Sequence, residues 1–386
     1  MKRPCAVIGV GQTRYAAKRQ DQSFTGLVRE AALRALDDAG LQFADIDAVV
    51  IGKAPDFFEG IMMPEHHLAS ALGAANKPMI RVHTAGSVGG STALYAAHLI
   101  AAGVHERVLC VAFEVQSCSN AMWALSPVYP FQPPVVAGAG GFFAPLIQAY
   151  INRSKAPQDV GWRVVMKDRR NAAKNPFAHL QGAPTYEQMQ SAQMLWDPIN
   201  YLETCPSSDG ACALVLSSEK AAAKAPSPPA FVQAMAQRSE PIFFPGRDAV
   251  SPQAGKDCAA ALYRQAQIKD PRAELDMAEI YVPFSWFEPM WLENLGFAEV
   301  DQGWRMVLDG STDFGGCLPV NVSGGVLSSN PIGASGMIRF AEAALQVKGQ
   351  AGAHQVPKAR RALGHAYGGG SQFFAMWIVG DTPMAG

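Results

Sequence analysis

The chain carries the same succession of elements twice. In the first half, an apolar strand is expected at 46–51, and a glycine-rich segment at 86–90 then opens a helix. In the second half, the apolar stretch 275–281 is followed by a glycine-rich segment at 323–336 that again opens a helix. The offset between the copies is about 225 to 245 residues, which is too long for a solenoid repeat and typical of a duplicated domain.

Apolar strands alternate with helices in both copies, and this alternation indicates a layered α/β fold. Hydrophobic residues make up 49% of the chain and charged residues 17%, as in a compact globular protein. We expect a ligand site where the glycine-rich loops of the two copies meet. The predicted divisions are an N-terminal half, 1–115 with 204–220; an inserted segment rich in Pro, Gly, Trp and Tyr, 116–203; a linker, 221–256; and a C-terminal half, 257–386.

Composition also disfavours several classes of protein. A net charge of −1 argues against a nucleic-acid-binding surface, which needs a basic surplus. No stretch reaches the roughly 18 uncharged apolar residues of a membrane span, and residues 5–10 read as a buried strand, not as part of a signal peptide. The seven cysteines form no CxxC pair, and no His/Cys cluster has zinc spacing. We therefore expect free thiols, a cytoplasmic location and no metal site.

The glycine-rich segment 86–90 is a candidate for binding an oxyanion. The start of a helix presents free N–H groups and a partial positive charge. Ser87 lies at this start, so its backbone N–H is a candidate donor to a negatively charged oxygen. The alternative is a helix start whose glycines serve close packing alone.

Short motifs over most of the chain match, in the same order, those of a known enzyme family. Residues 320–325 followed by 330–336 look like the pattern N-x-x-GG…G-H-P-x-G-A-[ST]-G. Three further segments match as well: 174–176 (KNP), 205–211 (CPSSDGA) and 355–370, which resembles Q-V-P-x-A…H…G-x-G-G.

These motifs resemble the thiolase superfamily, most closely the sterol-carrier-protein type of thiolase, which includes nonspecific lipid-transfer proteins and is similar to acetyl-CoA acetyltransferases. The resemblance implies a duplicated, five-layered αβαβα fold with an inserted loop domain, and a homodimer. It implies an acyl-CoA ligand, with coenzyme A as part of the substrate and no covalently bound cofactor. It also implies that Ser323, Gly324 and Gly325 contact the coenzyme A.

At the catalytic positions the sequence departs from the family pattern. Ser87 stands where thiolases carry the nucleophilic cysteine, and Asn330 replaces the histidine of G-H-P. Tyr281 opens the segment that aligns with N-E-A-F or H-D-C-F, and Ala366 aligns with the second cysteine. A serine hydroxyl is a weaker nucleophile than a thiolate and needs a neighbouring base. These replacements put acyl transfer through a cysteine in doubt.

Two histidines are candidate bases for Ser87. His365 lies one residue before Ala366, and His83 lies four residues before Ser87. For both histidines the alternative is a structural role. Alternative nucleophiles are Cys118, Cys205 and Cys212. We discount these three because buried free cysteines are common in proteins.

The donors of two oxyanion holes are retained. The resemblance implies that the N–H groups of Ser87 and Gly368 form one hole, and that Tyr281 and Asn330 form the other. Two such holes without a thiolate suit an enolate formed in aldol or retro-aldol cleavage. Some thiolase-like lipid-transfer proteins are retro-aldolases that use a tyrosine as acid or base, so Tyr281 and Tyr367 are candidates for that role. The alternative for Tyr281 is a strand residue packed beneath the inserted segment.

An aromatic run at 284–291 follows Tyr281 directly. It is a candidate lining for a bulky apolar acyl chain or a sterol ring. The alternative, which we favour slightly, is that the run packs a helix into the core.

We therefore expect an enzyme that acts on acyl-CoA thioesters of lipid, sterol or fatty-acyl metabolism. It would make or break a carbon–carbon bond beside the thioester carbonyl without a cysteine acyl-enzyme. One alternative is acyl transfer of the acetyl-CoA acetyltransferase type through Ser87, and another is a non-catalytic carrier of acyl-CoA or lipid, or a scaffold for a partner subunit. Retro-aldolases of this kind work with a small partner protein, so a partner with an OB fold and a zinc ribbon is expected beside the homodimer.

Overall fold

The strands of both halves join into one sheet. The computed structural model describes residues 3–54, 58–120, 138–241 and 245–384. Within these ranges a nine-stranded sheet has the order β3-β2-β4-β7-β1-β8-β11-β10-β9. Its strands are β1 (Cys5–Gln12), β2 (Ala48–Lys53), β3 (Met79–Val82), β4 (Arg107–Val115), β7 (Asp209–Ser218), β8 (Ala230–Ser239), β9 (Met277–Glu279), β10 (Arg361–Gly368) and β11 (Phe373–Gly380), and a separate pair is β5 (Met194–Trp196) with β6 (Ile199–Asn200).

The two halves of the sheet meet at β1 and β8, which pair through Ala6 with Phe231 and Val7 with Ala230. Away from this seam each half carries parallel strands at its outer edge, β3-β2-β4 on one side and β10-β9 on the other. The α-helices are α1 (Phe24–Ala39), α2 (Glu65–Ala71), α3 (Val88–Ala101), α5 (Gly138–Ser154), α6 (Val160–Ala172), α7 (Tyr186–Gln190), α8 (Glu219–Ala222), α9 (Gln253–Ala266), α10 (Pro271–Glu274), α11 (Phe287–Asn294), α12 (Gly303–Leu308), α13 (Gly325–Ser328) and α14 (Ile332–Lys348).

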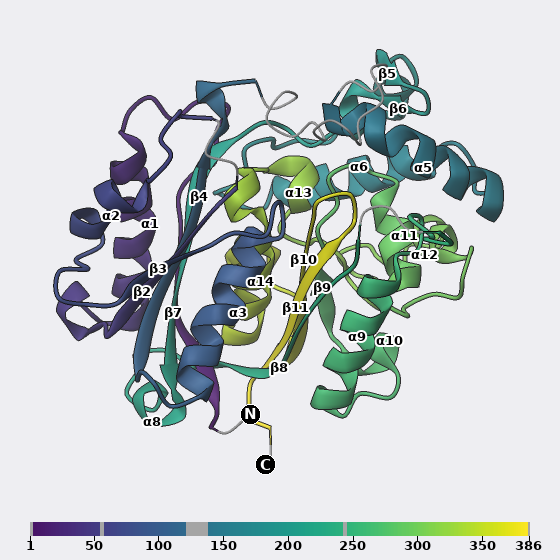
Figure 1. The fold of residues 1–386 in the computed structure, drawn as a ribbon. Coiled ribbons are helices and arrows are strands. Elements are labelled where there is room, and N and C mark those ends of the chain that lie inside the picture. The colour runs from purple at the N-terminus through teal and green to yellow at the C-terminus, as the bar shows by residue number, and fades with distance from the viewer. Residues whose placement is uncertain (1–2, 55–57, 121–137, 242–244, 385–386) are drawn as a thin grey trace.

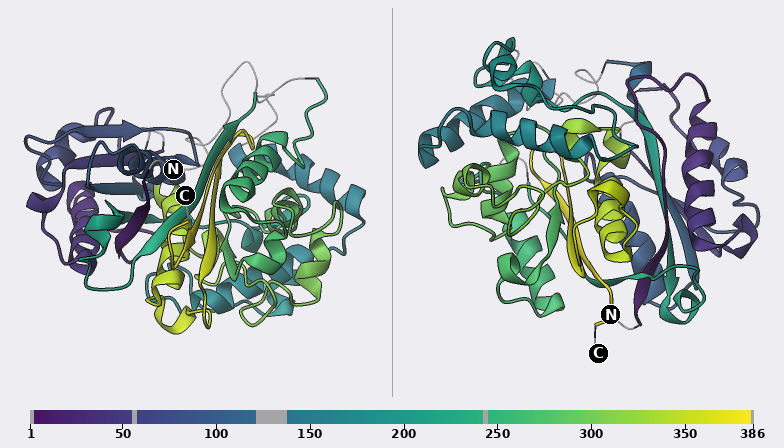
Figure 2. Two further views of the ribbon diagram at one scale, coloured as in Figure 1. Left: turned by 90° about the horizontal axis from the view of Figure 1, so that it is seen from below. Right: turned by 180° about the vertical axis from the view of Figure 1, so that it is seen from behind.

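Helices and sheet halves alternate as five layers. In Figure 1, α1 and α2 cover the outer face of the first sheet half, α3 and α14 lie between the halves, and α9 to α12 cover the second half. The views of Figure 2 show the same arrangement from below and from behind. The predicted five-layered αβαβα fold is therefore confirmed.

The glycines of the two copies allow the central helices to touch. A Cβ atom on Gly89 of α3 would lie 2.5 Å from the backbone N of Met337 in α14, and one on Gly336 would lie 2.8 Å from the N of Gly90. Any larger residue at these positions would push the two helices apart. The glycine-rich segments of the two halves therefore do meet, as the sequence predicts.

The strand expected at 46–51 is β2, and helices follow the glycine-rich segments at 86–90 and 323–336 as predicted. Ser23 caps α1 by accepting a hydrogen bond from the N–H of Gly26, and Gly40 ends this helix in the left-handed conformation. The aromatic run 284–291 leads into α11, and its residues are buried. This burial supports the core-packing alternative over a ligand pocket.

The segment 221–256 differs from the predicted linker. It contains β8, ten residues of the central sheet, because the apolar residues of 230–236 are buried between β1 and β11. The inserted segment 116–203 forms α5, α6, α7 and the β5-β6 pair, and residues 121–137 of it lie outside the described ranges. Among the described helices, none is long and apolar enough to cross a membrane.

Candidate active site

A strained turn holds Ser87 at the start of α3. Ala85 has a φ of +49°, which is unfavourable for a residue with a Cβ atom and typical of functional turns. Ser87 is fully buried, and its Oγ donates to the carbonyl oxygen of Thr84 at 2.7 Å, with the Oγ1 of Thr84 a further 3.0 Å contact. The hydroxyl therefore bonds to the residues of its own turn.

Gly368, at the end of β10, lies directly against this turn. A Cβ atom on Gly368 would overlap the backbone N of Ser87 and lie 2.6 Å from that of Gly86. The structure thus brings together the backbones of Ser87 and Gly368, as predicted. In this conformation the Ser87 N–H donates to the Thr84 carbonyl oxygen at 3.2 Å.

Tyr281 lies two residues beyond β9 and reaches the same place. Its hydroxyl is 3.4 Å from the Oδ1 of Asn330 and 3.7 Å from where a Cβ on Gly86 would stand. Its carbonyl oxygen accepts from the indole N–H of Trp291 at 2.8 Å. Burial raises the pKa of Tyr281 well above its ordinary value, so the phenol stays protonated.

Asn330 is held on three sides. Its Oδ1 accepts from the hydroxyl of Ser335 at 2.7 Å, and its Nδ2 donates to the Sγ of Cys205 at 3.1 Å. Its backbone N–H donates to the Oγ of Ser208 at 3.1 Å. Desolvation of the partly buried Cys205 raises the pKa of its thiol to about 12, so this group also stays neutral.

Tyr367 completes the group from β10. Its ring meets that of Tyr281 edge to face, with centroids 5.3 Å apart, and packs against Phe287 and Trp291 of α11. Burial raises the pKa of Tyr367 far above its ordinary value. Like Tyr281, it presents a protonated phenol.

His365 does not pair with Ser87, contrary to the role considered for it. Side chains alternate along a strand, and Ala366 faces the glycines of the central helices, so His365 points to the outer layer. There it packs against Trp291, and its Nδ1 accepts the backbone N–H of Tyr281 at 3.2 Å. Burial lowers the pKa of His365 to about 3, so the imidazole is neutral and anchors the backbone of Tyr281.

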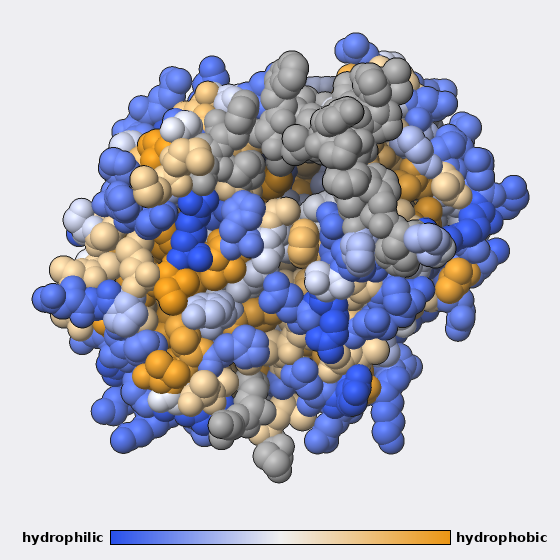
Figure 3. All heavy atoms as spheres, viewed as in Figure 1, coloured by the Kyte–Doolittle hydropathy of each residue, from blue (hydrophilic) through white to orange (hydrophobic). Residues whose placement is uncertain are grey.

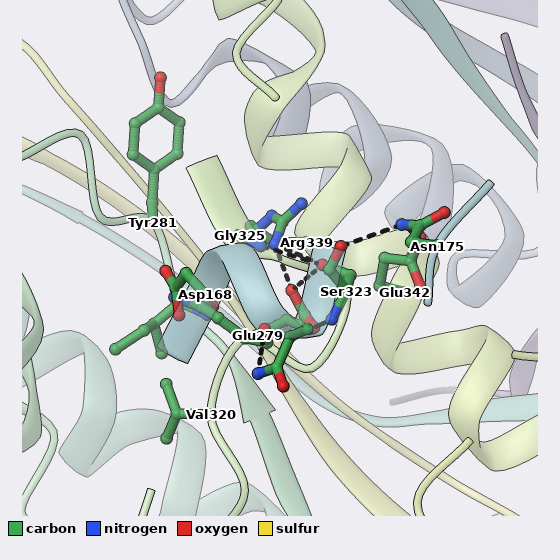
Figure 4. A network of polar contacts seen from close by, with 12 residues as sticks. Asp168, Asn175, Glu279, Tyr281, Val320, Ser323, Gly325, Arg339 and Glu342 are labelled. Atoms are coloured by element: carbon green, nitrogen blue, oxygen red, sulfur yellow. Dashed lines mark hydrogen bonds and ion pairs between the residues drawn. The ribbon is translucent and has the colours of Figure 1, made fainter. Parts of the chain in front are cut away.

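The predicted coenzyme A contacts at Ser323, Gly324 and Gly325 stay a prediction, and the structure places all three residues in the interior. Ser323 donates through its N–H and Oγ to the carboxylate of Glu279, which also pairs with Arg339. Figure 4 shows this network, with the ring of Tyr281 pointing away from it.

The packing of this turn explains why it carries glycines. Gly324 has a φ of +98°, and a Cβ atom there would lie 2.5 Å from the Cβ of Ala172 in α6. The glycine motif therefore serves close packing under the inserted segment.

Sequence reasoning missed two residues of the site. Cys205 was considered only as a nucleophile and Ser335 was not considered, yet both bond to the Asn330 amide. The only signal was their place in the CPSSDGA and GASG motifs. Among the described residues, no group of His, Cys, Asp and Glu could hold a metal ion.

Comparisons with known proteins agree with this architecture. A family model described as thiolase C-terminal domain-like matches residues 242–381. The acetyl-CoA acetyltransferase of Methanothermobacter thermautotrophicus is 29% identical over 384 residues, which cover 95% of this chain and 97% of the relative. Sterol carrier protein 2 of Bos taurus is 26% identical over 408 residues, which cover 98% of this chain and 73% of the relative.

Among solved structures, the Ltp2-ChsH2(DUF35) aldolase superposes with a TM-score of 0.85 at 27% identity, over 99% of both chains. The chain is therefore similar over almost its whole length to enzymes of the thiolase superfamily, sterol carrier protein 2 among them, and these likenesses support an enzyme of that superfamily.

Proposed function

We propose that the chain binds an acyl-CoA thioester between the two halves and makes or breaks the carbon–carbon bond beside the thioester carbonyl without an acyl-enzyme. One observation carries this proposal: Cys205 and Tyr281 contact the Asn330 amide, Tyr367 packs against Tyr281, and burial raises the pKa of all three so that each keeps its proton. Neutral hydrogen-bond donors stabilise an oxyanion, whereas an acyl-enzyme needs an activated nucleophile. Relatives named acetyl-CoA acetyltransferase and aldolase support a CoA thioester and carbon–carbon chemistry.

In the cleavage direction the substrate is a 3-hydroxyacyl-CoA. Its Cα–Cβ bond breaks, the bonding electrons move onto the thioester carbonyl as an enolate, and the β-carbon leaves as a ketone or aldehyde. Tyr281 and the amide of Asn330 donate hydrogen bonds to the enolate oxygen. Because the raised pKa of Tyr367 disfavours a tyrosinate, its phenol takes the β-hydroxyl proton while giving its own proton to Cα. The products are a carbonyl compound and a shorter acyl-CoA, so no cofactor is consumed and coenzyme A enters only as part of the substrate.

Acyl transfer through Ser87 is the weaker alternative. The Ser87 hydroxyl donates to the carbonyl of Thr84, and His365 lies on the other face of β10. A serine hydroxyl that donates to a main-chain carbonyl is a poor nucleophile at pH 7.

Two substrates separate these functions. Purified protein is incubated either with a 3-hydroxyacyl-CoA or with acetoacetyl-CoA and free coenzyme A, and the acyl-CoA products are separated by liquid chromatography. We expect a carbonyl product and a shorter acyl-CoA from the first mixture and no thiolysis in the second. Rapid thiolysis would refute the proposal, and tight binding of both thioesters without turnover would support a carrier.

We also propose that the chain forms a homodimer through the β3 edge of the sheet. Among the described strands β3 pairs only with β2, which leaves its other edge open. Figure 3 shows hydrophobic side chains gathered over β3 and α3, where Ile80 is 42% exposed and Tyr95 is 37% exposed. A second copy of the chain would continue the sheet and cover these side chains. Light scattering should give twice the monomer mass, and Ile80→Lys should shift it towards the monomer.

A small partner protein is the second partner we propose. The aldolase of known structure carries a name that joins two components, and it matches this chain over 99% of its length. An OB-fold and zinc-ribbon protein encoded with this chain should co-purify with it and raise its turnover.

Free thiols at all seven cysteines also support the proposed cytoplasmic location.

A further inference from the structure

We propose that Ser335 is a positioning residue that orients the Asn330 amide, so that an N–H and not the carbonyl oxygen faces the substrate thioester. This inference rests on the proposed function, because it concerns how the same site recognises the thioester oxygen. Ser335 itself does not touch the substrate, since it is fully buried in the first turn of α14.

The contacts of the amide define which end points where. The Oδ1 of Asn330 receives the Ser335 hydroxyl at 2.7 Å and is approached by the Tyr281 hydroxyl at 3.4 Å. The carbonyl oxygen of Pro331, the other acceptor near the Ser335 Oγ, is farther away at 3.1 Å. Ser335 is therefore the closer donor to the amide oxygen, and the Tyr281 hydroxyl, whose contact is longer, can turn its single hydrogen to the enolate oxygen.

The other end of the amide then keeps one free donor. An amide nitrogen carries two hydrogens, and one of these is donated to the Sγ of Cys205 at 3.1 Å. The second hydrogen has no partner among the described residues, and Asn330 is 3% exposed. In the proposed reaction this hydrogen is the one that meets the enolate oxygen.

The backbone beneath the amide is fixed independently of Ser335. The N–H of Asn330 donates to the Oγ of Ser208, which lies 2.9 Å from the Nδ1 of His179. The backbone N–H of His179 donates to the Oγ of Ser329 at 2.9 Å. These contacts hold the main chain of Asn330, so rotation of its amide about the last side-chain bond is the freedom that remains.

Loss of the Ser335 hydroxyl releases this rotation. With the amide turned over, the Cys205 thiol can donate to Oδ1 and the Tyr281 hydroxyl can accept from Nδ2, so the new orientation is also hydrogen-bonded. The amide oxygen would then face the thioester oxygen, and two acceptors repel each other. The substrate can still bind, but the developing negative charge loses a donor.

The test is the infrared carbonyl band of bound acetyl-CoA labelled with ¹³C at the thioester carbonyl. Acetyl-CoA lacks the β-hydroxyl and is not cleaved, so the band reports polarisation alone. In the unaltered protein the band should move to lower frequency on binding. Ser335→Ala should abolish most of this shift and lower kcat about 10- to 100-fold, with KM changed less than about threefold.

Two further variants distinguish a positioning role of Ser335 from a purely structural one. Ser335→Thr retains a hydroxyl and should restore the shift, which a purely structural role of the serine does not predict. Ser328→Ala is the matched control, because Ser328, at the end of α13, is also fully buried and its Oγ has no hydrogen-bond partner among the described residues. This control should leave both the shift and kcat unchanged.

The outcomes separate the inference from the proposed function. A full band shift in folded Ser335→Ala overturns the positioning role and leaves the proposed function intact. Failure of the unaltered protein to bind or polarise acetyl-CoA overturns the proposed function itself. A lost shift in Ser335→Ala that returns in Ser335→Thr supports the inference.

Discussion

The Nε2 of His354 lies 2.8 Å from the Oε2 of Glu342, and both side chains are almost fully buried. Burial alone would lower the pKa of His354, but the Glu342 carboxylate outweighs it and raises the pKa above the ordinary value. Burial alone would raise the pKa of Glu342, and His354 outweighs it in turn and lowers it. The pair joins α14 to the short helix at 352–354.

This pair predicts a window of greatest stability. The raised pKa of His354 contributes stability that is complete below the unfolded value of about 6.5 and is lost as the pH rises through the folded value. The lowered pKa of Glu342 contributes stability above about 4.3 that is lost as the pH falls. The combined contribution should therefore peak at about pH 4.5 to 6.5. Urea unfolding from pH 5 to 9 should show the free energy of unfolding falling on the alkaline side.

The control for this prediction is His354→Gln. Removal of one partner of a buried pair typically costs about 3 kcal/mol, so the variant should be less stable at pH 5.5 and should lose most of the alkaline dependence. An unchanged pH profile in the variant would assign the dependence to other groups.

Tyr281→Phe should lower the rate of 3-hydroxyacyl-CoA cleavage about 10²- to 10³-fold, because it removes one donor to the enolate oxygen. The fold should be retained, since the contact of the hydroxyl with Asn330 is long, at 3.4 Å. Tyr263→Phe is a matched control, because the Tyr263 hydroxyl donates to the carbonyl of Leu295 instead. Initial rates by chromatography and circular dichroism of both variants test this, and equal rates would remove Tyr281 from the site.

Gly368→Ala should impair the site through the backbone. The new Cβ would overlap the N of Ser87, so either β10 or the turn before α3 must move, at a cost of about 1–3 kcal/mol. We expect cleavage activity to fall more than tenfold and thermal stability to drop. Gly315→Ala adds the same atom where no other atom lies within 4 Å and should change neither.

The rate at which Cys205 is alkylated should show that the site holds a neutral thiol and not a thiolate. Cys317 and Cys118 are both exposed. Desolvation tends to raise the pKa of Cys317, but a hydrogen bond from Arg272 outweighs it and lowers this pKa. For Cys118, desolvation and the nearby Glu59 both raise the pKa. Iodoacetamide at pH 7.5 with peptide mapping should therefore modify Cys317 first. Cys205, with its pKa raised to about 12, should react at least about tenfold more slowly, and rapid labelling of Cys205 would show an activated nucleophile at the site.

The sequence predicts the layers and the meeting of the loops because glycine spacing reports close backbone approach. Gly89, Gly336 and Gly368 all lie where a Cβ would collide with another segment. At Ser323–Gly325 the same spacing also reports close packing, and the predicted contact of these residues with coenzyme A stays a prediction. The strand β8 was missed because its alanine-rich composition resembles a linker.

The side chains of the site were harder to predict. The position of His365 beside Ala366 suggested a base, but alternation along β10 turns its ring away from Ser87. The contacts of Ser335 and Cys205 with Asn330 join residues 5 and 125 positions apart, and no local pattern encodes the second of these. These relationships exist only in the folded chain.

Cleavage without an acyl-enzyme is the central feature of the proposed mechanism. Rapid mixing of the protein with a 3-hydroxyacyl-CoA, followed by acid quenching, allows the carbonyl product and the intact protein mass to be measured in the same sample. We predict that the carbonyl product accumulates while the protein mass stays unmodified at every time point. An acyl adduct on Ser87 that forms and decays with turnover would contradict the account.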